Sequence, residues 1–311
     1  MYNTSMQVNY YRNIKDRRIV ELTEPKAGSW IHVESPTPED LEKLAKDLNL
    51  ELDLLMDGID VYELPRLEVD RKAAYIFTRY PYLEKDQIVT VPVLFVVTDK
   101  FIASICAEEA PFLEVFSKMK KPLITTQTNK ALLEFLLEIN HTYDKYLTKI
   151  NKQIRAFEIR LQKIKNNDIV RFVEIEGVLN DFRPALMRMN GILESLTSGR
   201  YLTFRESDHD LSEDIMLSNR QLIEQTDDSI RTLKNIREAY TTIMTNNLNQ
   251  VIKLLTSLTV VFTIPTMVAS LYGMNVHLPF ESHPLAFVFV VGFIAILTSI
   301  TLYIFIKNDY F

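Results

Sequence analysis

Residues 254–274 read LLTSLTVVFTIPTMVASLYGM and contain no Asp, Glu, Lys or Arg. Residues 282–306, SHPLAFVFVVGFIAILTSITLYIFI, contain none either. Each stretch is about as long as the ~20 residues that a helix needs to cross ~30 Å of hydrocarbon. Buried core helices are the alternative, but two such stretches separated by a short loop favour a membrane. We therefore predict membrane helices at about 251–272 and 285–306, joined by an outer loop at 273–284.

The positive charges predict the orientation of these two helices. The connecting loop contains no Lys or Arg. Arg231, Lys234, Arg237 and Lys253 precede the first span, and Lys307 follows the second. Because Lys and Arg accumulate on the cytoplasmic side of a membrane, we expect both termini to lie in the cytoplasm. The protein is expected in the cell (inner) membrane. The N-terminal residues lack the apolar core of a signal peptide, so the C-terminal pair is expected to carry the membrane targeting.

Composition excludes several other classes. The chain has 311 residues, a formal net charge of −6 and one cysteine. A single thiol rules out a disulfide framework or a cysteine-based zinc module. The acidic balance argues against a nucleic-acid partner, which would need a basic face. We expect the lone Cys106 to be a buried small hydrophobic residue and not a nucleophile.

The region before the membrane spans divides into two parts. Residues 1–125 predict a cytoplasmic α/β domain, with an amphipathic helix after the cap candidates Ser35 and Thr37, then several β-rich runs. Residues 126–250 predict a helical region that ends in a stalk helix, and residues 251–311 form the transmembrane domain.

The stalk helix is predicted from an unusually long uninterrupted pattern. Helical spacing first runs from Asn129 to about Lys165, and a second helix is expected from about Ile169 to Leu196. Between Gly199 and Pro265 there is then no glycine and no proline. The 3.6-residue pattern continues into the first apolar span, so a helix from about Leu211 to Tyr272 would be ~90 Å long. Such a helix suggests a stalk that joins the α/β domain to the membrane.

The first span carries hydroxyl side chains along one face. Thr256, Thr259, Thr263, Thr266 and Ser270 follow one another at intervals of three and four residues. These hydroxyls could simply bond back to their own helix. One stripe cannot enclose a pore, so transport would require several copies of the chain. A lining without charges suits an ion that keeps much of its water, and Mg²⁺ dehydrates reluctantly.

Tyr272-Gly273-Met274-Asn275 closes this span, and its position resembles that of the Gly-Met-Asn motif of the CorA family of magnesium/cobalt transporters. Two further segments support the resemblance. Residues 30–37, with Trp30-Ile31-His32-Val33 before Ser35-Pro36-Thr37, are similar to an early strand-to-helix signature of the family. Residues 64–68, Leu-Pro-Arg-Leu-Glu, are similar to another family segment, with Leu64 in place of the usual Arg.

The resemblance implies a homopentameric channel with a cytoplasmic α/β funnel domain, a long stalk helix from each subunit and two C-terminal transmembrane helices. Gly273, Met274 and Asn275 would form the selectivity motif at the outer mouth. Family pore positions coincide with the stripe seen from spacing, and Ile252 and Leu255 would form a hydrophobic gate. The predicted pore-lining residues are Asn249, Ile252, Leu255, Thr259, Thr263, Thr266 and Ser270. Thr263 replaces a methionine of the family pore.

The resemblance also implies regulatory divalent-ion sites between neighbouring subunits. The carboxylate pair falls on Asp57 and Asp214, while Met56 stands where the family often has a second acid. Nine acids and five basic residues lie between Arg205 and Tyr240. Such a run can be a solvated helix face, but carboxylates facing each other across subunits would also repel unless Mg²⁺ bridged them. Mg²⁺ is thus expected as both the transported and the regulatory ion, with Co²⁺ as a further candidate.

Two alternatives remain open at this point. His277 and His283 in the outer loop could indicate a transporter of Zn²⁺, Co²⁺ or Ni²⁺ with the same fold, because imidazole suits those ions. A membrane-tethered coiled-coil scaffold or signalling protein would also fit the long helices, although it does not predict the hydroxyl stripe. Catalysis is not expected, since Asp208-His209-Asp210 has neither a phosphate-binding loop nor a nucleophile–base pair near it in the sequence.

Overall fold

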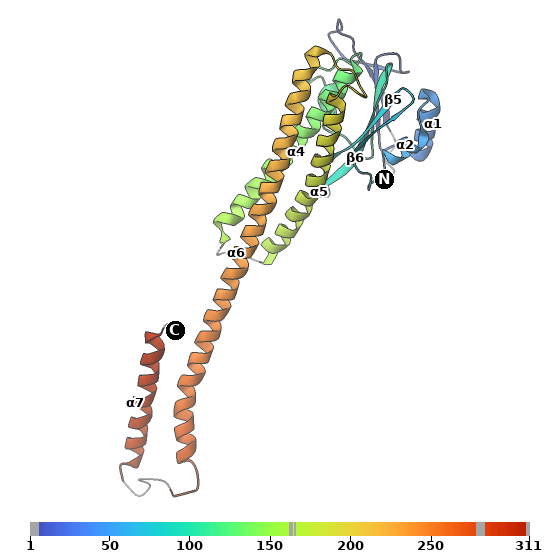
Figure 1. The fold of residues 1–311 in the computed structure, drawn as a ribbon. Coiled ribbons are helices and arrows are strands. Elements are labelled where there is room, and N and C mark those ends of the chain that lie inside the picture. The colour runs from blue at the N-terminus through green and yellow to red at the C-terminus, as the bar shows by residue number, and fades with distance from the viewer. Residues whose placement is uncertain (1–5, 162–163, 165, 278–283, 309–311) are drawn as a thin grey trace. The chain divides into compact units, whose positions relative to one another are not determined.

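The computed structural model describes residues 6–161, 164, 166–277 and 284–308 (Figure 1). The chain divides into two compact units, Met1–Asn235 and Ile236–Phe311. Helix α6 (Glu206–Tyr272) contributes residues to both units.

The first unit is built on a seven-stranded sheet with the order β2-β1-β3-β7-β6-β5-β4. Strand β3 pairs in parallel with β7, and every other neighbouring pair in the sheet is antiparallel. The strands are β1 (Met6–Tyr11), β2 (Val20–Leu22), β3 (Ser29–Glu34), β4 (Arg66–Asp70), β5 (Ala73–Glu84), β6 (Gln87–Val97) and β7 (Phe101–Cys106). The expected β-rich runs are therefore confirmed, and Thr98 closes the β6–β7 turn by donating its backbone N–H to the carbonyl oxygen of Phe101 at 3.0 Å.

Helices α1 (Pro38–Leu48) and α2 (Leu52–Asp57) cover one face of the sheet (Figure 1). Alternation along a strand sends successive side chains to opposite faces. Ile31 and Val33 therefore join the cluster that buries Leu41 and Leu55 from the two helices. Thr37 caps α1 in a reciprocal capping box with Asp40, which confirms one of the two predicted cap residues.

Long helices cover the opposite face. They are α4 (Thr128–Ile159) and α5 (Asn166–Thr197), with the short α3 (Glu114–Ser117) before them. Phe135 of α4 lies 5.0 Å from the ring of Trp30 and 5.5 Å from that of Phe95, centre to centre. Each such fully buried aromatic side chain contributes about 1.5–3 kcal/mol by leaving water, so this layer fixes α4 on the sheet. Cys106 is fully buried, as expected.

Three helix boundaries differ from the sequence expectations. Helix α4 ends at Ile159, α5 begins at Asn166 and α6 begins at Glu206, whereas the spacing predicted limits near 165, 169 and 211. Glu206 and Asp208 lie in the first turn of α6, where the positive end of the helix dipole stabilises their negative charges. Apolar periodicity does not reveal a first turn made of polar residues, so the predicted start of α6 was too late in the chain.

The second unit holds the C-terminal half of α6 and helix α7 (Ala286–Lys307). Both helices are long and apolar enough to cross a membrane, with mean hydropathies of 1.8 and 2.5 over their best windows. No residue of α7 is buried, and Phe287 is 78% exposed. An apolar helix with no covered face is stable in hydrocarbon and not in water.

Candidate functional site

The predicted pore-lining side chains all lie on α6. At 100° per residue they fall within an arc of about 120° on one side of that helix. Ile252 and Leu255 are 52% and 65% exposed, so no other part of the described chain covers the expected gate. The opposite side is partly covered, since Leu254 is 45% exposed whereas Ser257 is fully buried. One chain therefore presents a polar stripe without enclosing it.

The hydroxyl groups of this stripe are oriented by their own helix. Thr259, Thr263 and Thr266 donate to the carbonyl oxygens four residues earlier, at 2.8, 2.7 and 2.8 Å. The back-bonding alternative raised from the sequence is thus what the structure shows for these three residues. A hydroxyl has one proton and two acceptor lone pairs. Because the proton is used within the helix, the oxygen can only accept, which suits the water protons of a hydrated cation.

The expected selectivity motif begins where α6 ends. Gly273 donates its backbone N–H to the carbonyl oxygen of Ala269 at 2.9 Å, and Met274 donates to that of Leu271 at 3.3 Å. The negative end of the helix dipole therefore points toward the motif, which favours cations there. An added Cβ at Gly273 would meet only carbonyl oxygens of its own helix, at 3.4 and 3.6 Å. The fold of a single chain therefore does not require glycine at this position.

Asp57, one of the two expected regulatory carboxylates, is held by an arginine. Arg66 donates from Nη2 to the Oδ2 atom of Asp57 at 2.7 Å. The same guanidinium contacts the carboxylates of Glu63 and Glu68 and lies over the ring of Phe77 at 3.9 Å. Partial burial opposes its charge, but the three carboxylates outweigh that penalty and raise the pKa of Arg66. Asp57 thus has a cationic partner within the chain already.

Asp214, the second expected regulatory carboxylate, is exposed on α6. Other acids of the same run are paired inside the chain. Asp227 accepts from Arg183 at 2.6 Å, and the buried Asp208 lies 3.6 Å from the Nζ atom of Lys130. Within the described residues no three metal-binding side chains gather in one group. The structure therefore does not test the proposed pair of Asp57 and Asp214, which was expected to form between subunits.

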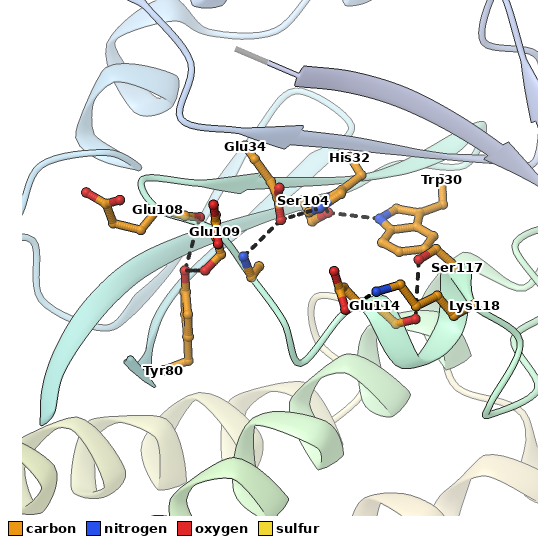
Figure 2. A network of polar contacts seen from close by, with 11 residues as sticks. Trp30, His32, Glu34, Tyr80, Ser104, Glu108, Glu109, Glu114, Ser117 and Lys118 are labelled. Atoms are coloured by element: carbon orange, nitrogen blue, oxygen red, sulfur yellow. Dashed lines mark hydrogen bonds and ion pairs between the residues drawn. The ribbon is translucent and has the colours of Figure 1, made fainter. Parts of the chain in front are cut away.

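A buried polar network between β3 and β7 was missed by the sequence reasoning (Figure 2). Trp30 donates from its indole nitrogen to Ser104 Oγ at 2.9 Å, and this oxygen lies 2.8 Å from His32 Nδ1. His32 Nε2 lies 3.0 Å from Glu34 Oε1, which also accepts the backbone N–H of Ala110 at 2.9 Å.

The proton positions in this network follow from its donors. An indole nitrogen can only donate, so Ser104 Oγ accepts the proton of Trp30 and shares its second hydrogen bond with His32 Nδ1. An ionised carboxylate can only accept, so Glu34 accepts from His32 Nε2. Burial opposes the charge of Glu34, but the bonds from His32 and Ala110 lower its pKa. Ser104 is fully buried. The contacting side chains of Ser104, His32 and Glu34 therefore link neighbouring strands, and a substrate cannot reach the serine.

Comparisons with known proteins agree with this architecture. The family profile of the CorA-like Mg²⁺ transporter protein matches residues 25–307. A cobalt/magnesium transport protein, CorA, of Methanocaldococcus jannaschii is 25% identical over 289 residues, which cover 90% of each chain. The complete structure of the CorA magnesium transporter from that organism superimposes with a TM-score of 0.88 at 21% identity, covering 98% of this chain and 99% of that one. The full-length CmaX protein gives a TM-score of 0.75 at 18% identity, with 97% of each chain covered.

Proposed function

The chain belongs to the family of CorA-like Mg²⁺ transporter proteins, and from this premise we propose that it is a homopentameric channel that admits Mg²⁺ down the membrane potential. The family makes it a divalent-cation transporter of the membrane. The ion, the passive mode and the number of subunits are our proposal. Co²⁺ is the second ion that the proposed pore would carry.

The observation that carries this proposal is the stripe on α6. It joins Asn249 to Ser270 along one side of a continuous helix and leads to Gly273-Met274-Asn275. Five copies around an axis would close the exposed stripes into a pore, with five Asn275 side chains at its outer mouth. The exposure of the stripe supports such an assembly, because the stripe would face the pore while the opposite side of the helix would face lipid or a neighbouring helix.

The lining favours an ion that keeps its water. Between Leu254 and His277 the chain has no charged side chain, so the proposed pore offers a Mg²⁺ ion no carboxylate to replace its water ligands. The threonine oxygens accept hydrogen bonds from those waters instead. Mg²⁺ usually retains several waters, whereas Zn²⁺ prefers direct bonds to nitrogen and sulfur ligands.

The membrane potential would supply the driving force. A single charge gains about 2.3 kcal/mol per 100 mV, so a divalent cation gains about 4.6 kcal/mol. With both termini in the cytoplasm, as we propose, the Gly-Met-Asn motif would lie on the outer side and the ion would move inward. No other energy source is needed for uptake as long as the cytoplasmic Mg²⁺ concentration stays below the value at which it balances the membrane potential.

An ion panel tests the proposed selectivity. Pure protein in liposomes should admit Mg²⁺ and Co²⁺, and hexamminecobalt, an inert cation with the octahedral shape of hydrated Mg²⁺, should inhibit Mg²⁺ uptake. The His277→Ala variant should leave Mg²⁺ uptake unchanged. Uptake of Zn²⁺ or Ni²⁺ that resists hexamminecobalt and falls in His277→Ala would favour the zinc-type alternative. His283, the other residue behind that alternative, lies outside the described residues.

We further propose that cytoplasmic Mg²⁺ closes the channel at Asp57 and Asp214. Carboxylate oxygens are suitable Mg²⁺ ligands, but Arg66 already neutralises Asp57 in the single chain. Asp214 therefore carries the greater part of the proposed negative charge at the subunit boundary. Asp214→Asn should raise the internal Mg²⁺ concentration needed to stop influx and should also weaken protection of the stalk from protease by Mg²⁺. Unchanged closure and protection would contradict this role.

A further inference from the structure

A polar groove lies between α4 and α6 within the first unit. Its volume is about 560 Å³, which is in the range of small-molecule sites. Ile154 is the one apolar side chain among the described residues that line it. Helices that pack on each other normally meet through apolar stripes, so a polar groove of this size along two packed helices requires an explanation.

Several hydrogen-bonding groups in the groove have no partner within the described chain and are accessible to a ligand, since Thr148 is exposed and Asn151 and Thr232 are half-buried. Ser229, which is 4% exposed, lies 2.5 Å from Asn151 Oδ1 and 2.6 Å from the carbonyl oxygen of Gln225, and its single proton can serve only one of them. In the described part of the chain, the amide nitrogen of Asn151 and the hydroxyls of Thr148 and Thr232 have no hydrogen-bond partner.

Other threonines of the same two helices bond within their own helix. Thr142 donates to the carbonyl oxygen of Glu138 at 2.8 Å, and Thr226 donates to that of Leu222 at 2.7 Å. Back-bonding of this kind satisfies a helical threonine hydroxyl within its own helix. The groove therefore holds a set of donors that the helices do not use.

Positive charge exceeds negative charge around the groove. Lys152 and Arg155 line it, and neither has an ion-pair partner among the residues that the structure describes. Two carboxylates also line it. Asp228 is neutralised by Arg231, whose Nη2 atom lies 2.6 Å from Oδ1, which leaves Glu158 against the two unpaired cations.

We propose that this groove binds a small phosphorylated anion that is polar throughout. The guanidinium of Arg155 and the ammonium of Lys152 supply the charge-assisted bonds that phosphate oxygens accept. The free amide and hydroxyl groups would hold the remaining polar part. No aromatic side chain lines the groove in the described residues, which argues against a nucleotide base as part of the ligand. The bound anion would link α4 to α6, the helix that carries the candidate pore stripe.

Calorimetry with inorganic pyrophosphate tests the site on the full chain in detergent and in Mg²⁺-free buffer. We expect saturable binding, and a dissociation constant at least tenfold higher for the double variant Lys152→Gln/Arg155→Gln. Arg155→Lys, which keeps the charge but loses the planar fork, should fall between the two. Lys149→Gln is the matched control, because Lys149 is exposed on the same helix and does not line the groove.

Two further arms identify the source of the phosphate. Pyrophosphate binding that persists in nanodiscs of phosphatidylglycerol and of phosphatidylcholine, and that glucose 6-phosphate competes away, indicates a free metabolite. Loss of pyrophosphate binding in nanodiscs of phosphatidylglycerol, but not of phosphatidylcholine, indicates a lipid headgroup. No saturable binding, or equal affinity in the wild type and the double variant, would overturn the proposal. Binding is read without any ion flux, so failure here leaves the proposed transport function untouched.

Discussion

Ser104 lies between two buried side chains that both depend on it. Its oxygen accepts the indole proton of Trp30 and lies 2.8 Å from His32 Nδ1 (Figure 2). A hydroxyl is the smallest group that can accept one bond and donate another at the same place. The sequence showed Trp30 and His32 as part of a family signature, but it gave no sign of Ser104, because the contact joins strands 74 residues apart.

Ser104→Ala should therefore destabilise the α/β domain. The change leaves the Trp30 N–H and the His32 Nδ1 atom buried without partners, at an expected cost of about 2 kcal/mol or more. Urea unfolding of the full chain, followed by the fluorescence of Trp30, the single tryptophan, measures the loss. Ser198→Ala is the control, since Ser198 is exposed, and should change stability by less than about 0.5 kcal/mol. Equal stability of both variants would show that the network is dispensable.

Glu34 predicts a pH dependence in the same network. Its pKa is lowered below the ordinary value of 4.5 despite burial, owing to bonds from His32 and Ala110. A lowered carboxyl pKa stabilises the folded state above the unfolded value and loses that effect as the pH falls through the folded value. Glu34→Gln should thus be less stable than the wild type at pH 7, and the difference should shrink between pH 5 and pH 3. A constant difference across that range would contradict the assignment.

At the scale of the element, the threonine oxygens of α6 remain able to accept hydrogen bonds, because the helix uses only their protons. Replacing Thr259, Thr263 and Thr266 by valine keeps the side-chain shape and removes these oxygens. The helix should still form, while Mg²⁺ influx should fall at least about tenfold, which corresponds to about 1.4 kcal/mol. Flux through reconstituted protein measures the effect. Thr301→Val is the matched control, because Thr301 of α7 makes the same back-bond, to Leu297 at 2.9 Å. Equal flux in all forms would mean that the oxygens do not serve the ion.

The elements were predicted from sequence to different degrees, for physical reasons. The continuity of α6 is visible because no glycine or proline interrupts the apolar repeat between Gly199 and Pro265. The parallel pairing of β3 with β7 is not visible, since partners so far apart leave no local pattern. The contact of Arg66 with Asp57 was missed for a related reason. It depends on the path of the chain between α2 and β4, which side-chain periodicity does not encode.

At the scale of the whole molecule, the exposed apolar helices of the second unit and the open stripe of α6 require partners that one chain lacks. Lipid satisfies the apolar surface, but a polar stripe in a membrane needs other polar groups or water. We therefore propose assembly around the stripe. The expected native mass is that of five chains of 36.2 kDa each in addition to bound detergent. A dimeric mass together with no ion flux would favour the scaffold alternative.

Voltage-driven Mg²⁺ influx is the most direct test of the proposed channel. Liposomes that hold the pure protein and a fluorescent Mg²⁺ indicator would be given a potassium diffusion potential, negative inside, without any other energy source. Influx should begin when the potential is imposed, should increase with its size, and should be abolished by Asn275→Ala at equal protein content. Influx that is independent of the potential, or that is undiminished in Asn275→Ala, would contradict a passive channel that admits Mg²⁺ through the Gly-Met-Asn mouth.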